Sequence, residues 1–337
     1  MAYATDASVY QEMPLAVCIP HNVEDLKILI RFARENGVTL IPRTAGTSLA
    51  GQVVGDGIVV DVSRAFNQIL EVNAEEGWAI VQPGVIRDDL NAYLRPYGLM
   101  FGPETSTASR AMIGGMIGNN SSGLHSIVWG DTRQNLIAAQ VLLDDESEVT
   151  FEALDEAAYF SKLTASGREG EIYRGINTLL ANKENQEAIH AGFPKSDITR
   201  RNTGYALDLL SNTNKPFNMC NLLAGSEGTI GIVTSAKIKL MPLPPKEIGL
   251  VCIHFSDMVE CMRGNVIALK HRPEASELVD KYILDFTVGH PTYQYNRFFI
   301  EGDPEALLIV EFRADNLADI MRQAEGLIAE LKALGLG

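Results

Sequence analysis

Residues 42–52 read Pro42-Arg43-Thr44-Ala45-Gly46-Thr47-Ser48-Leu49-Ala50-Gly51-Gln52 and follow an apolar run at residues 38–41 that is typical of a buried strand. The small side chains and two glycines allow backbone N–H groups to approach an anion closely, and Thr47 and Ser48 add hydroxyl donors. A diphosphate requires this chemistry. The loop matches neither GxGxxG nor GxxxxGK[ST]. Turns select the same residue types, so an ordinary turn is the alternative for this stretch alone.

Three later segments are also rich in small residues. Residues 102–123 contain five glycines, and their apolar ridge at residues 112–117 has the spacing of a short helical turn packed into a core. Residues 224–233 lead into a strand predicted at residues 232–240, and residues 81–85 end a predicted hairpin. Several small-residue loops, each tied to a strand, favour a protein that wraps an extended cofactor rather than a mononucleotide.

Six motifs in this order resemble the FAD-linked oxidase and dehydrogenase superfamily typified by vanillyl-alcohol oxidase and para-cresol methylhydroxylase. They are Pro42-Arg43-x-x-Gly46-Thr47-Ser48, Val81-Gln82-Pro83-Gly84-Val85, Pro103-Glu104-x-Ser106, Ile113-Gly114-Gly115-x-Ile117, Arg201-Asn202-Thr203-Gly204-Tyr205 and Gly225-Ser226-Glu227-Gly228-Thr229-x-Gly231-Ile232-Val233-Thr234. They cover roughly residues 14–242 and most resemble the D-2-hydroxyacid dehydrogenases, which include D-2-hydroxyglutarate and D-lactate dehydrogenases and the FAD subunit of glycolate oxidase. Tyr3-Ala4-Thr5-Asp6-x-Ser8-x-Tyr10 resembles large bacterial fusions of such a flavoprotein with a C-terminal iron–sulfur region.

The resemblance implies an FAD site. The residues that it assigns to the cofactor are Pro42, Arg43, Thr44, Ala45, Gly46, Thr47, Ser48, Gly51, Gln52, Val85, Pro103, Glu104, Ser106, Ser109, Gly114, Gly115, Asn119, Ser122, Gly123, Glu227, Gly228, Gly231, Ile232 and Val233. Relatives with tethered flavin carry His at the position of Thr47, which cannot form the histidyl link. The FAD is therefore expected to be non-covalent.

The implied reaction is FAD-dependent oxidation of a D-2-hydroxy acid to the 2-oxo acid, with hydride transfer to flavin N5. A substrate carboxylate is suited to bidentate binding by Arg, so Arg201 is the candidate clamp and Tyr205 would orient the substrate. The alternative is that Arg200 and Arg201 are surface charges. The catalytic residue stays unassigned: the family's H-x-x-x-x-N-x-H motif is absent, and His290 is followed by Pro-Thr-Tyr.

The electrons are expected to pass to a quinone, another flavoprotein or an iron–sulfur region. Two alternatives stay open, an alcohol or alditol oxidase that uses oxygen and a non-catalytic FAD-binding module of an electron-transfer complex. Thr47 and the motif at residues 201–205 speak against the oxidase. The absence of the His-rich motif keeps the non-catalytic module open.

Charge and cysteine usage exclude other classes. The net charge of −15, from 28 basic and 43 acidic residues, disfavours nucleic acid and anionic membrane surfaces as partners. No apolar run reaches about 18 residues, so membrane insertion is not expected. The start of the chain has neither a charged n-region nor an apolar h-region. The four cysteines form no CxxC pair, so we expect no metal site and free thiols in the cytoplasm.

The pattern along the chain predicts an α+β fold. Residues 1–242 are expected to form a two-lobed FAD-binding domain, with a small β-α-β lobe at about residues 1–66 and a larger mixed or antiparallel sheet with helices at about residues 67–242. The boundary is Met241-Pro242-Leu243-Pro244-Pro245, where prolines break regular structure. Residues 246–337 are expected to form an incomplete ferredoxin-like α+β cap domain, and the chain to be the N-terminal part of a longer protein.

Overall fold

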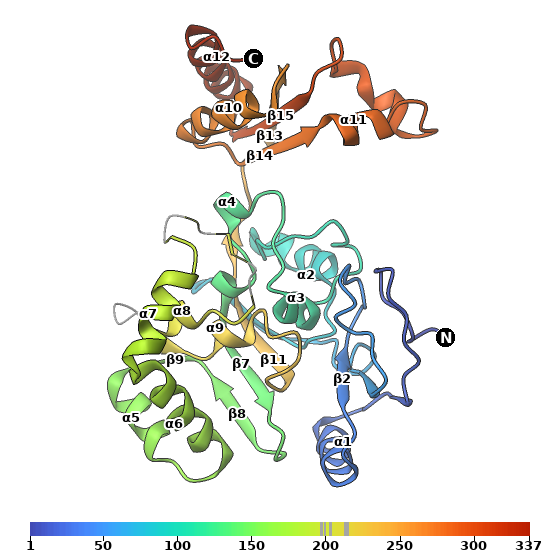
Figure 1. Cartoon of the computed structure of the whole chain (residues 1–337), viewed down its shortest axis with the longest axis vertical. Coiled ribbons are helices and arrows are strands. Elements are labelled where there is room, and N and C mark those ends of the chain that lie inside the picture. The colour runs from blue at the N-terminus through green and yellow to red at the C-terminus, as the bar shows by residue number, and fades with distance from the viewer. Residues whose placement is uncertain (196–197, 199, 202–203, 212–215) are drawn as a thin grey trace. The chain divides into compact units, whose positions relative to one another are not determined.

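The computed structural model describes residues 1–337 except 196–197, 199, 202–203 and 212–215. The described chain divides into two compact units, shown in Figure 1 with the colours of the sequence. The first unit contains Met1–Gly123 and Gly130–Pro242, and the second contains Leu124–Trp129 and Leu243–Gly337. The structure thus groups residues 124–129 with the second unit, whereas the sequence kept them in the first domain.

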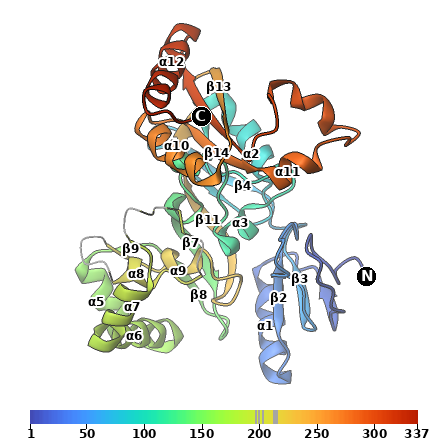
Figure 2. The same cartoon turned by 45° about the horizontal axis from the view of Figure 1, so that its top comes forward.

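The first unit begins with a small β-α-β lobe. Its parallel strands β1 (Ala16–Cys18), β3 (Ile58–Asp61) and β2 (Leu40–Arg43) lie in the order β1-β3-β2, next to helix α1 (Val23–Asn36) (Figure 2). The Asn22 side chain accepts a hydrogen bond from the Asp25 N–H and caps α1, a role for which Asn is well suited. Leu26 and Ile30 of α1 pack with Val60 of β3 in one core cluster. The predicted first lobe is confirmed.

A five-stranded antiparallel sheet forms the centre of the larger lobe. The strands β4 (Ile69–Asn73), β5 (Trp78–Val81), β11 (Ile232–Lys239), β7 (Leu136–Leu142) and β8 (Glu148–Phe151) lie in that spatial order. The sequence predicts hairpins at residues 68–82 and 140–151; both are present, and β11 pairs with one strand of each. Because β11 follows the loop at residues 224–231, this pairing brings that loop to the hairpins.

Helices complete the first unit. Helix α3 (Ile113–Asn119) buries Ile113, Met116 and Ile117 in the main core, as their spacing predicts. The other helices are α2 (Arg87–Leu94), α5 (Glu156–Thr164), α6 (Gly167–Ala181), α7 (Lys183–Gly192), α8 (Leu207–Leu210), α9 (Cys220–Leu223) and the 3-10 helices η1 (Arg95–Tyr97) and η2 (Arg133–Asn135). Two short strand pairs are β6 (Leu99–Met100) with β12 (Met241–Pro242) and β9 (Ala153–Leu154) with β10 (Phe217–Asn218).

The second unit has a three-stranded antiparallel sheet in the order β13 (Glu247–Phe255), β15 (Ala306–Ala314), β14 (Ala275–Asp280). Helices α10 (Met258–Lys270) and α12 (Leu317–Ala333) pack against it, and α11 (Lys281–Phe286) and η3 (Tyr293–Phe299) lie between β14 and β15 in the sequence. This is the β-α-β-β-α order that the sequence predicts.

The short helix α4 (Ser126–Trp129) is anchored within the second unit. His125 Nε2 lies 3.0 Å from Glu311 Oε1 of β15, and Arg313 Cζ lies 5.6 Å from the centroid of the Trp129 ring. These contacts explain why residues 124–129 belong to that unit. Among the described residues, no helix has the length and hydropathy needed to cross a bilayer.

Candidate functional site

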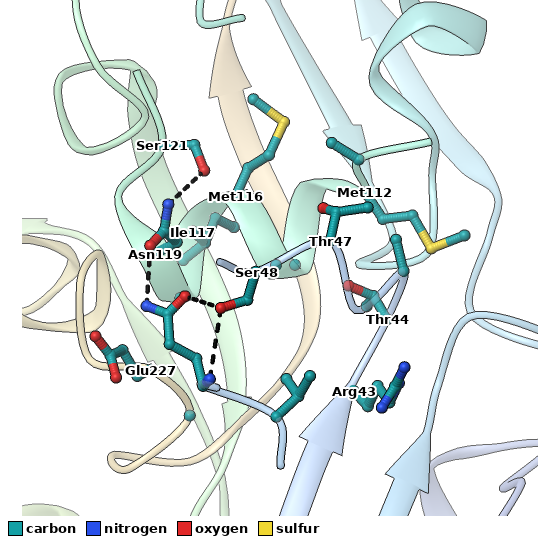
Figure 3. Close-up of a pocket in the computed structure, with 18 of the residues that line it drawn as sticks. Arg43, Thr44, Thr47, Ser48, Met112, Met116, Ile117, Asn119, Ser121 and Glu227 are labelled. Carbon is teal, nitrogen blue, oxygen red and sulfur yellow. Dashed lines mark hydrogen bonds between the residues drawn. The ribbon is translucent and has the colours of Figure 1, made fainter. Parts of the chain in front are cut away.

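A cavity of about 480 Å³ lies in the first unit, within the roughly 300–1,000 Å³ typical of cofactor and small-molecule sites. Its walls are the phosphate loop (residues 42–52), helix α3 with the residues before it, and the loop before β11 (Figure 3). The predicted cofactor residues that line it are Pro42, Arg43, Thr44, Ala45, Gly46, Thr47, Ser48, Gln52, Ser106, Gly114, Gly115, Asn119, Ser122, Glu227, Gly228, Gly231, Ile232 and Val233. The structure thus brings three predicted sequence segments to one cavity.

The phosphate loop presents unpaired backbone donors. Among the described residues, no acceptor receives a hydrogen bond from the backbone N–H groups of residues 44–48. Buried or half-buried N–H groups are nearly always paired, so a row of such donors along a cavity fits an anion. Gly46 has a φ of +66°, a backbone conformation that side chains with a Cβ rarely adopt. The loop therefore fits the diphosphate of a dinucleotide.

The Arg43 guanidinium lies close behind this loop. A Cβ on Gly46 would collide with it, and its Nη1 donates a hydrogen bond to the Thr5 carbonyl at 2.9 Å. Arg43 is 9% exposed. Its charge therefore supports an anion from behind the loop, while the N–H groups of residues 44–48 are placed for direct contact.

A chain of side-chain hydrogen bonds joins the phosphate loop to α3 (Figure 3). Ser48 Oγ donates to Gln52 Oε1, and Gln52 Nε2 donates to Asn119 Oδ1 at 2.9 Å. Asn119 Nδ2 in turn donates to Ser121 Oγ at 3.1 Å. All four side chains line the cavity. These hydrogen bonds therefore join the four polar side chains of this wall in one network.

The third wall is attached to α3 through its backbone. The Gly225 N–H donates to the Ile117 carbonyl at 2.9 Å, and the Glu227 N–H donates to the Gly118 carbonyl at 2.9 Å. Glu227 has a φ of +53°. Glu227 and Arg43 are the acidic and basic side chains of the cavity lining. These bonds fix the loop at residues 225–231 against the helix that carries the Gly-Gly pair.

Gly115 allows close approach between α3 and the phosphate loop. A Cβ at this position would lie 2.9 Å from Thr44 Oγ1, and both residues line the cavity. Gly114 serves packing, since its N–H donates to the Pro83 carbonyl at 2.8 Å. A larger residue at 115 would enter the space between these walls. The cavity depends on this glycine for its width.

Some predicted cofactor residues do not line the cavity: Gly51, Val85, Pro103, Glu104, Ser109 and Gly123. Val85 is buried in the core, and its carbonyl accepts a hydrogen bond from the Ile113 N–H at 3.0 Å. A Cβ on Gly123 would collide with the Glu104 side chain, so these two residues pack against each other. Val85, Glu104 and Gly123 therefore lie behind the walls. Their contact with a cofactor stays a prediction.

The two predicted substrate residues lie outside the cavity lining. Arg201 Nη1 forms an ion pair with Asp208 Oδ2, and these side chains are 16% and 19% exposed. The Tyr205 hydroxyl is hydrogen-bonded to Thr229 Oγ1. Asn202 and Thr203 of the same motif lie outside the described residues.

Arg200 is not among the predicted site residues, and a surface charge is the alternative that the sequence leaves open for it and for Arg201. Its Nε donates a hydrogen bond to Ser122 Oγ at 3.1 Å, and Ser122 lines the cavity. Its only sequence signal was its place next to Arg201. The structure thus joins the Arg200 guanidinium, directly before this motif, to a residue of the cavity wall.

The buried Arg133 side chain is hydrogen-bonded to backbone carbonyls of two separate chain segments. Its guanidinium donates to the carbonyls of Arg201, Gly204 and Ala224 at 3.3, 3.0 and 2.6 Å. Burial lowers the pKa of Arg133, but arginine stays charged at neutral pH. This residue was missed because no motif includes it. It ties the predicted substrate motif to the loop at residues 224–231.

Other lining residues were also missed by sequence reasoning. They are Ala7, Leu49, Ala50, Val53, Val62, Pro83, Thr105, Thr107, Ala111, Met112, Met116, Ile117, Gly118, Ser121, Leu223 and Ser226. Most of these residues are sequence neighbours of predicted ones, so the motifs locate the segments better than the individual contacts. Ala7 and Val62 are exceptions, since they lie 35 positions before Pro42 and ten positions after Gln52. Among the described residues, no group of three or more His, Cys, Asp or Glu side chains is placed to hold a metal ion.

Comparisons with known proteins agree with this geometry. Residues 14–152 match the model of the FAD binding domain family. The chain is 35% identical to D-2-hydroxyglutarate dehydrogenase of Pseudomonas putida over 98% of its own length and 33% of that protein, and 29% identical to glycolate oxidase subunit GlcD of Bacillus subtilis over 90% and 54%. A solved structure of alkyldihydroxyacetonephosphate synthase has a TM-score of 0.60 at 17% identity, covering 94% of this chain and 50% of that one, which shows a shared fold. The chain spans about a third of the length of the dehydrogenase.

Proposed function

We propose that this chain, of which residues 14–152 match the FAD binding domain family, is the flavin-binding part of a D-2-hydroxyacid dehydrogenase. The observation that carries the proposal is the cavity, with its unpaired N–H groups at residues 44–48 opposite α3. The similarity to D-2-hydroxyglutarate dehydrogenases over nearly the whole chain supports the substrate class. Bound FAD would supply the acceptor for the hydride of the substrate α-carbon.

Different walls of the cavity would hold different parts of the cofactor. The N–H groups of residues 44–48 would bind the diphosphate, with the Arg43 charge behind them. The remaining walls, at residues 112–117 and 226–233, would hold the flavin and the adenosine part. Thr47 lines the cavity where tethered relatives carry His, so we propose non-covalent binding. Residues 1–242 would form the FAD-binding domain and residues 246–337 part of the substrate cap.

The substrate carboxylate is assigned to the motif at residues 201–205 and to Arg200 directly before it. Charge-assisted hydrogen bonds from a guanidinium favour a carboxylate over a neutral ligand. Asp208 already neutralises the Arg201 guanidinium, whereas among the described residues the Arg200 guanidinium contacts only the Ser122 hydroxyl. We therefore add Arg200 to Arg201 and Tyr205 as acid-binding candidates.

The proposal also covers the substrate, the electron acceptor and the location of the protein. The substrate is a small 2-hydroxy acid, and the electrons pass to a separate acceptor, which is a quinone, a flavoprotein or an iron–sulfur region. The cysteines are free in the structure, in agreement with the proposed cytoplasmic location.

The test is anaerobic reduction of the FAD-loaded protein by a panel of D-2-hydroxy acids. D-2-Hydroxyglutarate, D-lactate and glycolate are added in turn, with the L-enantiomers of the first two as matched controls. Loss of the oxidised flavin bands with a D-acid but not its L-enantiomer is the expected result. If every acid leaves the flavin oxidised, the chain by itself is a non-catalytic FAD module. Reduction followed by stoichiometric peroxide in air would instead support the oxidase alternative.

A further inference from the structure

The segment at residues 3–10 precedes all six motifs, yet it forms part of the cofactor site. It folds back on itself, with an antiparallel bridge between Thr5 and Gln11 and a hydrogen bond from the Glu12 N–H to the Ala4 carbonyl at 2.9 Å. Ala4 is fully buried. The segment is therefore a fixed element of the first unit, which we call the clasp.

The clasp is bonded to the phosphate loop at several points. The Ala7 N–H donates to the Ser48 carbonyl at 3.0 Å, and the Thr5 carbonyl accepts from Arg43 Nη1 at 2.9 Å. A Cβ on Gly51 would lie 2.8 Å from Cδ2 of Tyr10, so the Tyr10 ring covers the end of the loop. The start, middle and end of the loop thus each contact the clasp.

Tyr3 completes the environment of two buried charges. Its hydroxyl donates to Asp61 Oδ2 at 2.7 Å, and its ring centroid lies 5.4 Å from Arg43 Cζ. Arg43 and Asp61 are 9% and 4% exposed. Buried charged groups are stable only when they are hydrogen-bonded or paired. Removal of the clasp would leave the Arg43 guanidinium without the Thr5 carbonyl and expose the back of the phosphate loop.

Ala7 also lines the cavity itself. The clasp therefore contributes both to the shape of the anion-binding loop and to the wall around a bound ligand. A contact of this kind acts mainly on the rate of release, because a ligand held by a closed wall leaves only after the wall opens.

We propose that residues 3–10 are a cofactor-positioning segment, in which Tyr3, Thr5 and Ala7 hold the phosphate loop in its anion-binding shape and slow the release of FAD. This inference rests on the proposed FAD site and adds residues that the six motifs do not contain. Tyr3 and Thr5 act through Arg43 and Asp61, so they are positioning residues.

The test compares FAD release from the full chain, from the Tyr3→Phe variant and from a variant that lacks residues 1–10. Tyr282→Phe is the matched control, since Tyr282 is 78% exposed in the second unit. Release is followed by the change in flavin fluorescence after dilution. Loss of one hydrogen bond to a charged group predicts about a tenfold faster release for Tyr3→Phe. The deletion should release FAD faster still, and the control should match the full chain.

Two further measurements distinguish a role of the clasp in positioning the phosphate loop from a general contribution to the stability of the fold. The FAD association rate should stay within about twofold for Tyr3→Phe, so that the loss of affinity appears in the release rate. Hydrogen–deuterium exchange at residues 3–10 should slow when FAD binds. Equal release rates for all variants, or exchange that FAD leaves unchanged, would overturn the clasp while the proposed function stands. A full chain that binds FAD with a working clasp but is not reduced by any acid would overturn the enzymatic proposal alone.

Discussion

Gln52 Nε2 donates a hydrogen bond to Asn119 Oδ1 at 2.9 Å and joins the phosphate loop to helix α3. The two residues come from segments far apart in the chain, and the first segment taken alone is compatible with an ordinary turn. Their contact, continued to Ser48 and Ser121, makes one polar wall of the cavity. The proposed FAD site therefore depends on this side-chain network as well as on the glycines.

Substitution of Gln52 tests this network. Gln52→Leu keeps a similar volume and removes both hydrogen bonds, so the two loops lose their side-chain connection. A neutral hydrogen bond contributes about 0.5–1.5 kcal/mol, which predicts a weakening of FAD affinity on the order of tenfold. The measurement is a titration of the FAD-free protein with FAD. Gln323→Ala, at an exposed position of α12, is the control, and equal affinities for the two variants would refute a role of the network in cofactor binding.

Gly115→Val tests the width of the cavity. The Cβ would already lie 2.9 Å from Thr44 Oγ1, and the two methyl groups would extend into the space assigned to the cofactor. We expect the purified variant to contain no FAD and to remain folded by circular dichroism. Gly175→Val is the matched control, because a Cβ at Gly175 meets nothing within 4 Å. Normal flavin content in Gly115→Val would show that the cofactor does not bind between these walls.

Substitutions of Arg200 and Arg201 should distinguish an effect on acid binding from an effect on the stability of the fold. Arg200→Ala should weaken binding of a D-2-hydroxy acid by about tenfold, since a charge-assisted hydrogen bond contributes about 1.5–3 kcal/mol. The melting temperature and flavin content should not change, because Arg200 is exposed. Acid binding is followed through the absorbance of the bound flavin. An affinity equal to that of the unmodified chain would remove Arg200 from the acid site.

Arg201→Ala should have two effects. It should weaken acid binding to a similar extent, and it should lower the melting temperature because Asp208 loses its partner. Asp208 Oδ1 is already buried without a hydrogen bond within the described chain, so this carboxylate is poorly placed to stand alone. The double variant Arg201→Ala with Asp208→Asn should recover part of the lost stability. A lower melting temperature with unchanged acid affinity would assign Arg201 to support of the loop only.

The stability of the first unit should fall at high pH. Burial raises the pKa of the Cys220 thiol to about 12 from an ordinary value of 9.0. The unfolded chain releases this proton near pH 9, while the folded chain keeps it until about pH 12. Stability is therefore fully present below pH 9 and decreases as the pH rises towards 12. Cys220→Ala should flatten this decrease in the free energy of unfolding measured by urea denaturation, and an unchanged slope would contradict the assignment.

The sequence predicts the strands and loops of this molecule better than its contacts. The β-α-β lobe, both hairpins and the helix at residues 113–119 follow from local periodicity, capping by Asn22 and glycine placement, which act within a few residues. The order of the sheet does not, because β11 pairs with strands ninety or more residues earlier in the chain. Long-range pairing of this kind leaves no local pattern.

The side-chain contacts of the candidate site could not be predicted from the sequence for the same reason. The motifs identify the segments that surround the cavity, but the network through Gln52 and Asn119 and the buried Arg133 arise from the packing of separate segments. Arg43 illustrates the difference, since its place in the motif suggests direct contact with phosphate, whereas its guanidinium hydrogen-bonds to the Thr5 carbonyl behind the loop. The acid-binding motif was read as Arg201 and Tyr205, and the contact of Arg200 with Ser122 is visible only in three dimensions.

The most direct test of the account is the visible absorption spectrum of the purified chain, followed by titration of the flavin-free protein with FAD. The account predicts the bands of oxidised flavin, release of the flavin on denaturation because it is not tethered, and saturation at one FAD per chain. A colourless protein that binds no added FAD would contradict the assignment of the cavity, and with it the proposed reaction.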